Sequence, residues 1–150
     1  FWMLGSVAGA SWEKLLLPLL AVVVIGTGMM AVSNWMDALA AGPETAAALG
    51  VRVGAMRVGL FIGLGVLIGC LVAVSGGIGF VGLIVPHAAR LMVGADHRVL
   101  LPAAALLGIA VLTLSDTAAR LLFAPLELPV GILMAVIGAP FFLYLLRRQL

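Results

Sequence analysis

The longest stretch of this sequence without a charged side chain runs from Val58 to Ala89, and it is the feature that most constrains the fold. As one helix this stretch would reach about 48 Å, which is longer than one crossing of a bilayer's roughly 30 Å hydrocarbon core and shorter than two. The run must therefore break within its length. Ser75-Gly76-Gly77 is the expected break, because adjacent glycines weaken a helix and permit a tight reversal.

The rest of the chain has the same character, since hydrophobic residues make up 65% of it and charged residues only 9%. A soluble domain carries about 25% charged residues. Lipid cannot hydrogen-bond the backbone, which leaves helices or a closed barrel as spanning structures, and the apolar runs here are continuous rather than alternating. We therefore predict an all-α polytopic membrane protein. The net charge of +2 rests on few ionisable groups, so no nucleic-acid partner is expected.

Charged residues divide the chain into stretches that approach the roughly 20 residues of a membrane-spanning helix. We expect about five spans in a single transmembrane domain over residues 1–150, at 15–32, 58–74, 78–93, 99–122 and 130–146. Alternating crossings place Lys14 and Arg120 on one side of the membrane. The other side then receives the remaining basic residues, Arg52, Arg57, Arg90, Arg98, Arg147 and Arg148. Because cytoplasmic loops collect Lys and Arg, that second side is predicted to be cytoplasmic.

The predicted cytoplasmic loop over residues 33–57 has signals for structure of its own. Pro43 and Glu44 suit a helix start, since proline lacks the donor that a first turn leaves unpaired and the acid lies near the positive end of the helix dipole. Gly50 suits a C-terminal cap. We expect a short helix over residues 44–49, and the alternative is a solvated linker with one helical turn.

Nothing in the sequence predicts catalysis or a metal site in this chain. His87 and His97 lack Cys, Asp or Glu partners at ligand spacing, so both are interpreted as structural histidines. The segment from Gly77 to Gly82 spells the dinucleotide fingerprint but joins two bilayer-length runs instead of a strand and a helix. No Walker A sequence is present, so any ATP must bind to another chain.

Two further patterns concern helix faces. Asp116 and Arg120 are four residues apart and share a face on a continuous helix. One interpretation is an interfacial ion pair worth about 0–1 kcal/mol. The other is a cationic docking point for an extracytoplasmic partner. Glu127 lies in the turn that follows. The glycine pairs 59/63 and 65/69 have the spacing that allows close helix approach, although with 19 glycines some such pairs arise by chance.

An ordered set of motifs resembles the permease family of binding-protein-dependent ABC importers for ferric siderophores, haem and cobalamin. The motifs are the segment Gly77–His87 with Arg90, Asp96-His97-Arg98, Asp116 with Ala119-Arg120, Glu127–Gly131 and Ile137–Phe141. Trp2, Gly5-Ser6 and Trp12 also resemble the family's segment between its fifth and sixth spans. The resemblance implies the C-terminal half of a ten-span subunit, and we expect the natural N-terminus to lie outside this sequence, which begins at Phe1.

The resemblance implies three functional regions. A coupling surface toward the ATPase subunit would contain Pro43, Glu44, Ala47, Leu49 and Gly50, with reduced charge because the family often has Gly-Glu-Glu where this chain has Gly42-Pro43-Glu44. Arg120 matches an outward-facing arginine that meets acidic residues of the substrate-binding protein, and its neighbour Asp116 would belong to the same docking surface. Gly131 and Gly138 are expected to contribute to the translocation path, because missing side chains leave room for a bulky chelate.

The resemblance also implies the partners and the location. Two permease copies would sit in the cytoplasmic (inner) membrane with an ATPase dimer that holds ATP and Mg, and with one periplasmic or lipoprotein binding protein. The chain itself would be no enzyme and would hold no cofactor. Two alternatives stay open: a non-transporting scaffold, and an ion-gradient-driven transporter or channel. The latter would normally place ionisable groups within its spans, and the first, second and fifth spans have none.

Overall fold

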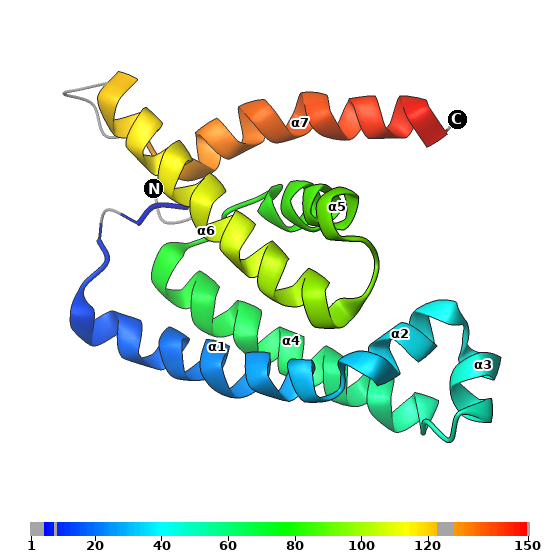
Figure 1. Cartoon of the computed structure of the whole chain (residues 1–150). Helices are drawn as coiled ribbons and strands as arrows, with labels where there is room; N and C mark the ends of the chain where they lie inside the picture. Colours follow the sequence, from blue (N-terminus) through cyan, green and yellow to red (C-terminus); the bar gives the residue numbers. More distant parts are fainter. Residues whose placement is uncertain (1–4, 8, 123–127, 150) are drawn as a thin grey trace.

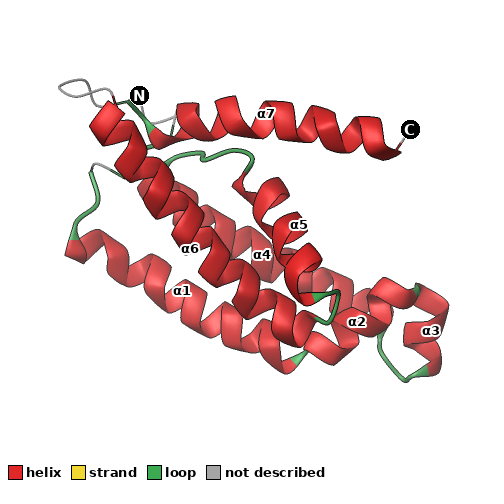
Figure 2. Cartoon of the chain, turned by 45° about the horizontal axis from the view of Figure 1, so that its top comes forward, coloured by secondary structure: helices red, strands yellow, loops and turns green. Residues whose placement is uncertain are grey.

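The computed structural model describes residues 5–7, 9–122 and 128–149, and over these residues all regular structure is helical (Figure 2). Seven helices follow one another along the described chain: α1 (Trp12–Ala31), α2 (Ser33–Ala41), α3 (Pro43–Ala48), α4 (Val53–Ser75), α5 (Val81–Val93), α6 (His97–Leu122) and α7 (Val130–Gln149). The predicted all-α fold is confirmed. The loop expected at 33–57 contains an additional helix, α2, which the sequence did not predict.

Four of the described helices, α1, α4, α6 and α7, are long and apolar enough to cross a membrane. The third predicted span differs, because the stretch from Ile78 to Val93 is helical only over the 13 residues of α5. A helix of that length reaches about 20 Å and falls short of the hydrocarbon thickness. The helix break predicted at Ser75-Gly76-Gly77 is confirmed: α4 ends at Ser75, and Gly76 follows with a φ of 69°.

The segment between α4 and α6 nevertheless runs back from the end of α4 to the level at which α4 starts. α4 packs against α3 at its start, and α6 packs against α2, so both helices start at the same end of the molecule. The return path combines α5 with the non-helical segment 76–80, which we call the α4–α5 linker. An extended residue covers about twice the distance of a helical one, so a short helix plus a linker spans what one long helix would.

The helices form two groups, shown in Figure 1. In one group α1 and α4 lie side by side and antiparallel, and in the other α5, α6 and α7 pack against one another. Helices α2 and α3 project at one end of the α1–α4 pair. We call this the α2–α3 end of the molecule and refer to the opposite one as the far end.

The helix directions place the basic residues at the two ends of the molecule in the groups that the sequence predicted. α1, α5 and α7 run toward the α2–α3 end, whereas α4 and α6 run away from it (Figures 1 and 2). Lys14 at the start of α1 and Arg120 near the end of α6 therefore belong to the far end. The α2–α3 end receives the basic residues at the opposite helix termini, Arg52, Arg57, Arg90, Arg98, Arg147 and Arg148.

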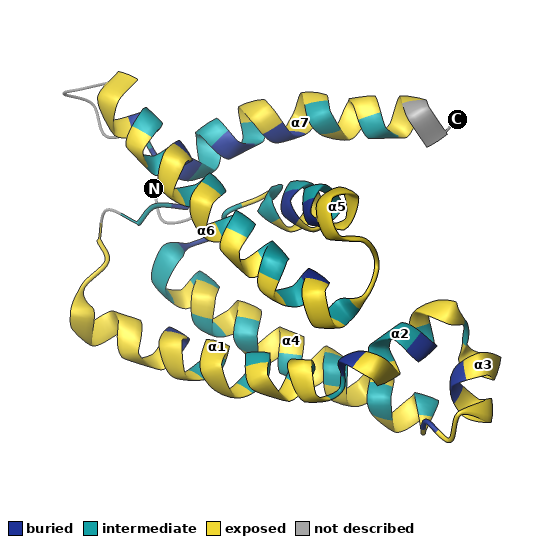
Figure 3. Cartoon of the chain, in the orientation of Figure 1, coloured by how far each residue is buried: buried dark blue, intermediate teal, exposed yellow. Residues whose placement is uncertain are grey.

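Burial is sparse on the long helices (Figure 3). α4 has no buried residue, and Pro18 is the only one on α1. Large apolar side chains such as Phe61, which is 82% exposed, point outward. The buried hydrophobic residues of the described chain lie around α2–α3 and among α5, α6 and α7: Ala38, Ala46, Val51, Val85, Ala89, Leu100, Ala119, Val130 and Met134. Surfaces this apolar require lipid or other protein around them.

Candidate functional site

The predicted coupling surface is built on α3, whose ends are set by local sequence. Pro43 occupies the first turn of α3 and Glu44 follows it at the positive end of the helix. At the other end the Gly50 N–H donates to Ala47 O (2.9 Å) and the Val51 N–H donates to Ala46 O (3.0 Å), with Gly50 at a φ of 80°. This is a Schellman cap, in which glycine supplies the left-handed residue. The predicted helix and its glycine cap are confirmed.

A small apolar core holds α2 and α3 together. Ala38 of α2, Ala46 of α3 and Val51 after the cap are buried against one another. The residues predicted to couple to an ATPase all lie on the outside of this unit, since Pro43, Glu44, Ala47, Leu49 and Gly50 are exposed. Leu49 is 70% exposed, and an apolar side chain so placed on a rigid helix end is available to a partner.

A contact that sequence reasoning missed joins this unit to α6. One carboxylate oxygen of Asp37 on α2 accepts a hydrogen bond from the His97 backbone N–H (3.1 Å) and lies 2.5 Å from His97 Nδ1. An ionised carboxylate only accepts, so Nδ1 carries the hydrogen. The hydrogen bond from the His97 side chain is the main cause that lowers the pKa of Asp37 below its ordinary value. His97 is thus a structural histidine, as predicted, with a carboxylate partner that no local spacing reveals.

The far end carries the second predicted group. Arg120 Nε donates to Asp116 Oδ2 at 2.8 Å across one turn of α6, so the predicted shared face and ion pair are confirmed. The two side chains are 49% and 26% exposed, respectively. Asp116 also borders a cavity of about 200 Å³ whose other walls are Val7, Leu112, Thr113, Thr117 and Val130. Glu127, which the sequence places in the following turn, lies outside the described residues.

The predicted path residues lie on α7 beside the α4–α5 linker. A cavity of about 470 Å³ separates the two segments, lined by Gly77, Gly79, Phe80, Gly131, Ile132, Ala135 and Val136. Irregular backbone at membrane depth is tolerated where it is buried in protein or lines a cavity, and the linker fits the second condition. Gly131 therefore lies on the cavity wall. Gly138 does not line it and instead makes room for Phe80.

Phe80 has an unusual backbone conformation. Its φ of 65° is the only positive value among the non-glycine residues that the structure describes. A non-glycine residue in this region costs about 1–3 kcal/mol and persists where surrounding contacts hold it. A Cβ atom added at Gly138 would overlap the Cβ and Cγ of Phe80, so this glycine is needed for the phenyl ring to sit against α7.

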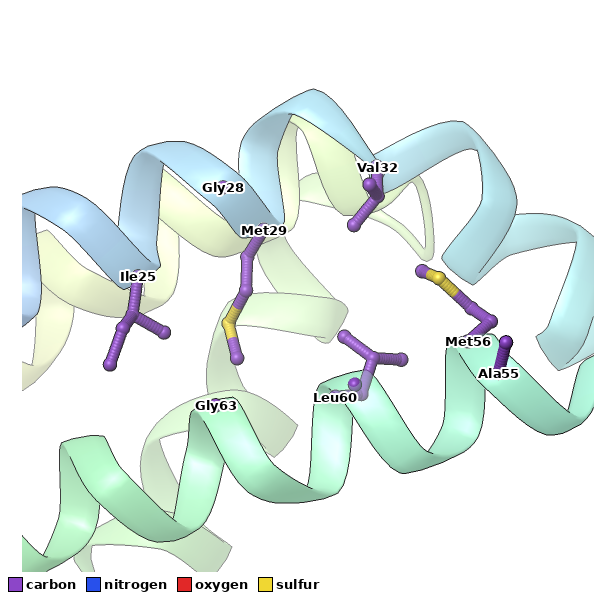
Figure 4. A pocket seen from close by; sticks show the side chains of 9 residues that line it. Ile25, Gly28, Met29, Val32, Ala55, Met56, Leu60 and Gly63 are labelled. Carbon is purple, nitrogen blue, oxygen red and sulfur yellow. The ribbon is translucent and has the colours of Figure 1, made fainter.

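The first glycine pair singled out in the sequence faces α1, and the second does not. An apolar groove of about 280 Å³ runs between α1 and α4, and Figure 4 shows the residues that line it: Ile25, Gly28, Met29, Val32, Ala55, Met56, Gly59, Leu60 and Gly63. A Cβ at Gly63 would lie 3.6 Å from Ile25 Cγ2, which is ordinary contact. Gly65 and Gly69 have nothing within 4 Å of the added Cβ. The predicted close approach is therefore seen at Gly63, whereas Gly59 lines the groove with nothing within 4 Å of its added Cβ.

His87 on α5 packs edge-on against Phe141 on α7, with 6.0 Å between the ring centroids. Across the described residues, no group of three or more His, Cys, Asp or Glu side chains is placed to hold a metal ion. His87 therefore contributes to the contact between α5 and α7, in line with its interpretation as a structural histidine.

Comparison with known proteins assigns this arrangement to a family. The sequence matches the FecCD transport family over residues 1–148. The chain belongs to the FecCD transport family. It is 44% identical over 99% of its length to the hemin transport system permease protein HmuU of Yersinia pestis, and it covers 44% of that protein. It is 48% identical over 99% of its length to the cobalamin import system permease protein BtuC of Halobacterium salinarum, and it covers 40% of that protein.

A solved structure described as an inward-facing ABC transporter of proposed metal-chelate type has the same fold. This FecCD chain shares 40% sequence identity with it, at a TM-score of 0.91 over 99% of this chain and 48% of the other. The chain thus spans less than half the length of the relatives it matches. With four long apolar helices and this family membership, it is a multi-pass membrane protein of a transport family.

The predicted residues of this FecCD chain fall into three regions instead of one site. The predicted coupling residues lie on α3 and its cap, the predicted docking pair lies near the end of α6, and the predicted path residues lie on α7. α6 connects the two end regions, since His97 at its start contacts α2 and Arg120 lies near its last residue.

Proposed function

We propose that this chain forms part of the membrane permease of an ABC importer in the cytoplasmic membrane, and that the importer takes up a ferric chelate (siderophore or haem) or cobalamin. Two permease subunits would enclose the path. An ATPase dimer with its ATP and Mg would bind the α2–α3 end, and a substrate-binding protein would bind the far end. This chain would supply the coupling surface and part of the wall, and it would carry out no chemistry itself.

The observation that carries the proposal is the exposure of Leu49 and its neighbours at the arginine-rich end. Leu49 and the residues around it project from a helix whose own core and cap hold it rigid. Cytoplasmic segments collect Lys and Arg, so this end is the one that an ATPase in the cytoplasm can reach. The names of the relatives, which include hemin and cobalamin permeases, support the same class of transport.

The cavity beside Phe80 supports an apolar route for the substrate. Its wall consists of glycine and apolar side chains, so a large chelate would pass without meeting a fixed charge. A gradient-driven transporter would instead need ionisable groups that change protonation or bind ions within its spans. The charged residues of α1, α4 and α7 lie within the first two turns or the last turn of these helices, which disfavours that alternative.

The coupling assignment is tested with Leu49→Asp in the intact permease. A leucine buried in an interface contributes about 1.5–3 kcal/mol, so the affinity for the ATPase subunit should fall about tenfold or more. Ala40→Asp on the exposed part of α2 adds the same charge outside the predicted surface and serves as the control. Equal ATPase affinity for both variants and the wild type would remove α3 from the coupling surface.

The substrate class is tested by uptake into proteoliposomes that contain the permease, its ATPase and its binding protein. Hemin, a ferric hydroxamate and cyanocobalamin are the three probes, each supplied with and without internal ATP. ATP-dependent uptake of one probe is expected. Uptake that needs an ion gradient and no ATP would favour the secondary-transporter alternative, and absence of any uptake would favour the scaffold.

A further inference from the structure

The start of α6 is capped by two carboxylates, one from the residue directly before α6 and one from α2. Asp96, which directly precedes α6, accepts a hydrogen bond from the Arg98 N–H at 2.9 Å. Asp37, on α2, accepts from the His97 N–H at 3.1 Å and also meets the His97 ring. The first N–H groups of a helix lack partners within it and favour negative charge. One cap is therefore local, whereas the other ties α6 to the α2–α3 unit.

The hydrogen bond between Asp37 and His97 connects α6 to the core of the α2–α3 unit. Asp37 precedes Ala38, which is buried in the small core that holds α2 against α3. The His97 and Asp37 side chains are 16% and 35% exposed, respectively, so the contact is partly shielded from water. In the part of the chain that the structure describes, no other side-chain hydrogen bond joins α2 or α3 to a helix beyond the neighbouring α1. A displacement of α3 thus reaches α6 through this polar contact together with the packing of α2 against α6.

α6 continues from this contact to the opposite end without a break. Its 26 residues span about 39 Å. Ser115 on α6 donates to the sulfur of Met134 on α7 at 3.3 Å, which links α6 to the helix that walls the cavity. Asp116 follows Ser115 directly and pairs with Arg120 one turn later. A rigid helix tied at one end therefore carries motion both to the cavity wall and to the far surface.

We propose that Asp37 and His97 form the latch through which movement of the α2–α3 unit is passed to α6, so that binding at the far end and ATP hydrolysis at the α2–α3 end influence each other. This inference rests on the proposed ABC-importer function. Asp37 acts as a positioning residue: it touches neither substrate nor nucleotide, and its role is to hold α6 to the unit that an ATPase would move. Two distant sites are coupled only if a structural element joins them and makes different contacts in the two states of the transporter.

The test compares Asp37→Ala with Asp96→Ala in the complete transporter in proteoliposomes, by measuring ATP hydrolysis with and without the substrate-binding protein. Each variant loses one carboxylate cap of α6, and only Asp37→Ala breaks the tie to α2. Asp37→Ala should keep ATPase assembly and the basal rate while the stimulation by binding protein falls about fivefold or more. Asp37→Asn should restore part of the stimulation, since the amide oxygen still accepts from the His97 N–H.

The outcomes separate the latch from the proposed function. Wild-type stimulation in Asp37→Ala, or an equal loss of stimulation in Asp37→Ala and Asp96→Ala, overturns the latch and leaves the importer function standing. If the wild-type complex shows no stimulation by binding protein at all, the importer function fails and the latch fails with it. His97→Ala combined with Asp37→Ala should be no worse than either single change if the two residues act as one unit.

Discussion

Phe80 and Gly138 are mutually dependent, because the phenyl ring occupies the space in which any side chain at position 138 would begin. The contact joins the α4–α5 linker to α7 at a depth of about 12 Å along α7 from Val130. It fixes one side of the cavity that also contains Gly131. A residue with positive φ and a glycine on a neighbouring helix thus define the shape of the predicted path together.

Gly138→Ala is expected to destabilise the protein by about 1–3 kcal/mol, the usual cost of overpacking a contact with no spare room. Thermal unfolding in detergent, followed by loss of monodispersity, measures the effect. Gly69→Ala is the matched control, because nothing lies within 4 Å of its added Cβ. Phe80→Gly removes the atoms that clash, so Gly138→Ala should cost much less in that background. Additive effects of the two changes would contradict the direct contact.

Gly50→Ala should weaken the cap of α3. The residue has a φ of 80°, and an L side chain in the left-handed region costs about 1–2 kcal/mol. The expected results are lower thermal stability and weaker ATPase binding, measured on purified permease. Gly54→Ala, in the first turn of α4 and in open space, should be neutral or slightly stabilising, since alanine is the better helix former. Equal stability of the two variants would show that the cap is unimportant.

Arg120→Glu should lower the affinity of the substrate-binding protein about tenfold at low salt, or about 1.4 kcal/mol. The change reverses an exposed charge and sets it beside Asp116, and electrostatic complementarity governs docking of this kind. Lys14→Glu provides the control, since it reverses a charge at the start of α1 on the same end of the molecule. An affinity that does not change with Arg120→Glu would leave the pair as an interfacial ion pair only.

The link between α2 and α6 should weaken in acid. The His97 hydrogen bond lowers the pKa of Asp37 below 3.8, so the carboxylate binds protons less readily in the folded than in the unfolded state. The stabilisation is therefore present at neutral pH and is lost as the pH falls below about 4 through the lowered pKa. The difference in free energy of unfolding between the wild type and Asp37→Asn, followed between pH 3 and 6, should be steady above about pH 4 and shrink as the pH falls further. A constant difference across the range would contradict the ionised link.

Local spacing was sufficient to predict several parts of the site. The Asp116–Arg120 pair follows from a four-residue interval on one helix, and the cap at Gly50 follows from a glycine after a short helical pattern. The helix break at Ser75-Gly76-Gly77 follows from length and glycine content in the same way. Each depends on residues a few positions apart, whose geometry a helix dictates before any tertiary contact forms.

The class of molecule follows from the amino-acid sequence alone, because long uncharged runs can satisfy their backbone groups in lipid only as helices. The positions of the arginines likewise predict which helix ends lie on the same side. Tertiary structure alone decided that α5 is short, that Phe80 needs Gly138, and that Asp37 reaches His97. These relations join residues far apart in the chain. Their partners are selected by how whole helices pack and cross, and no interval along the sequence encodes that geometry.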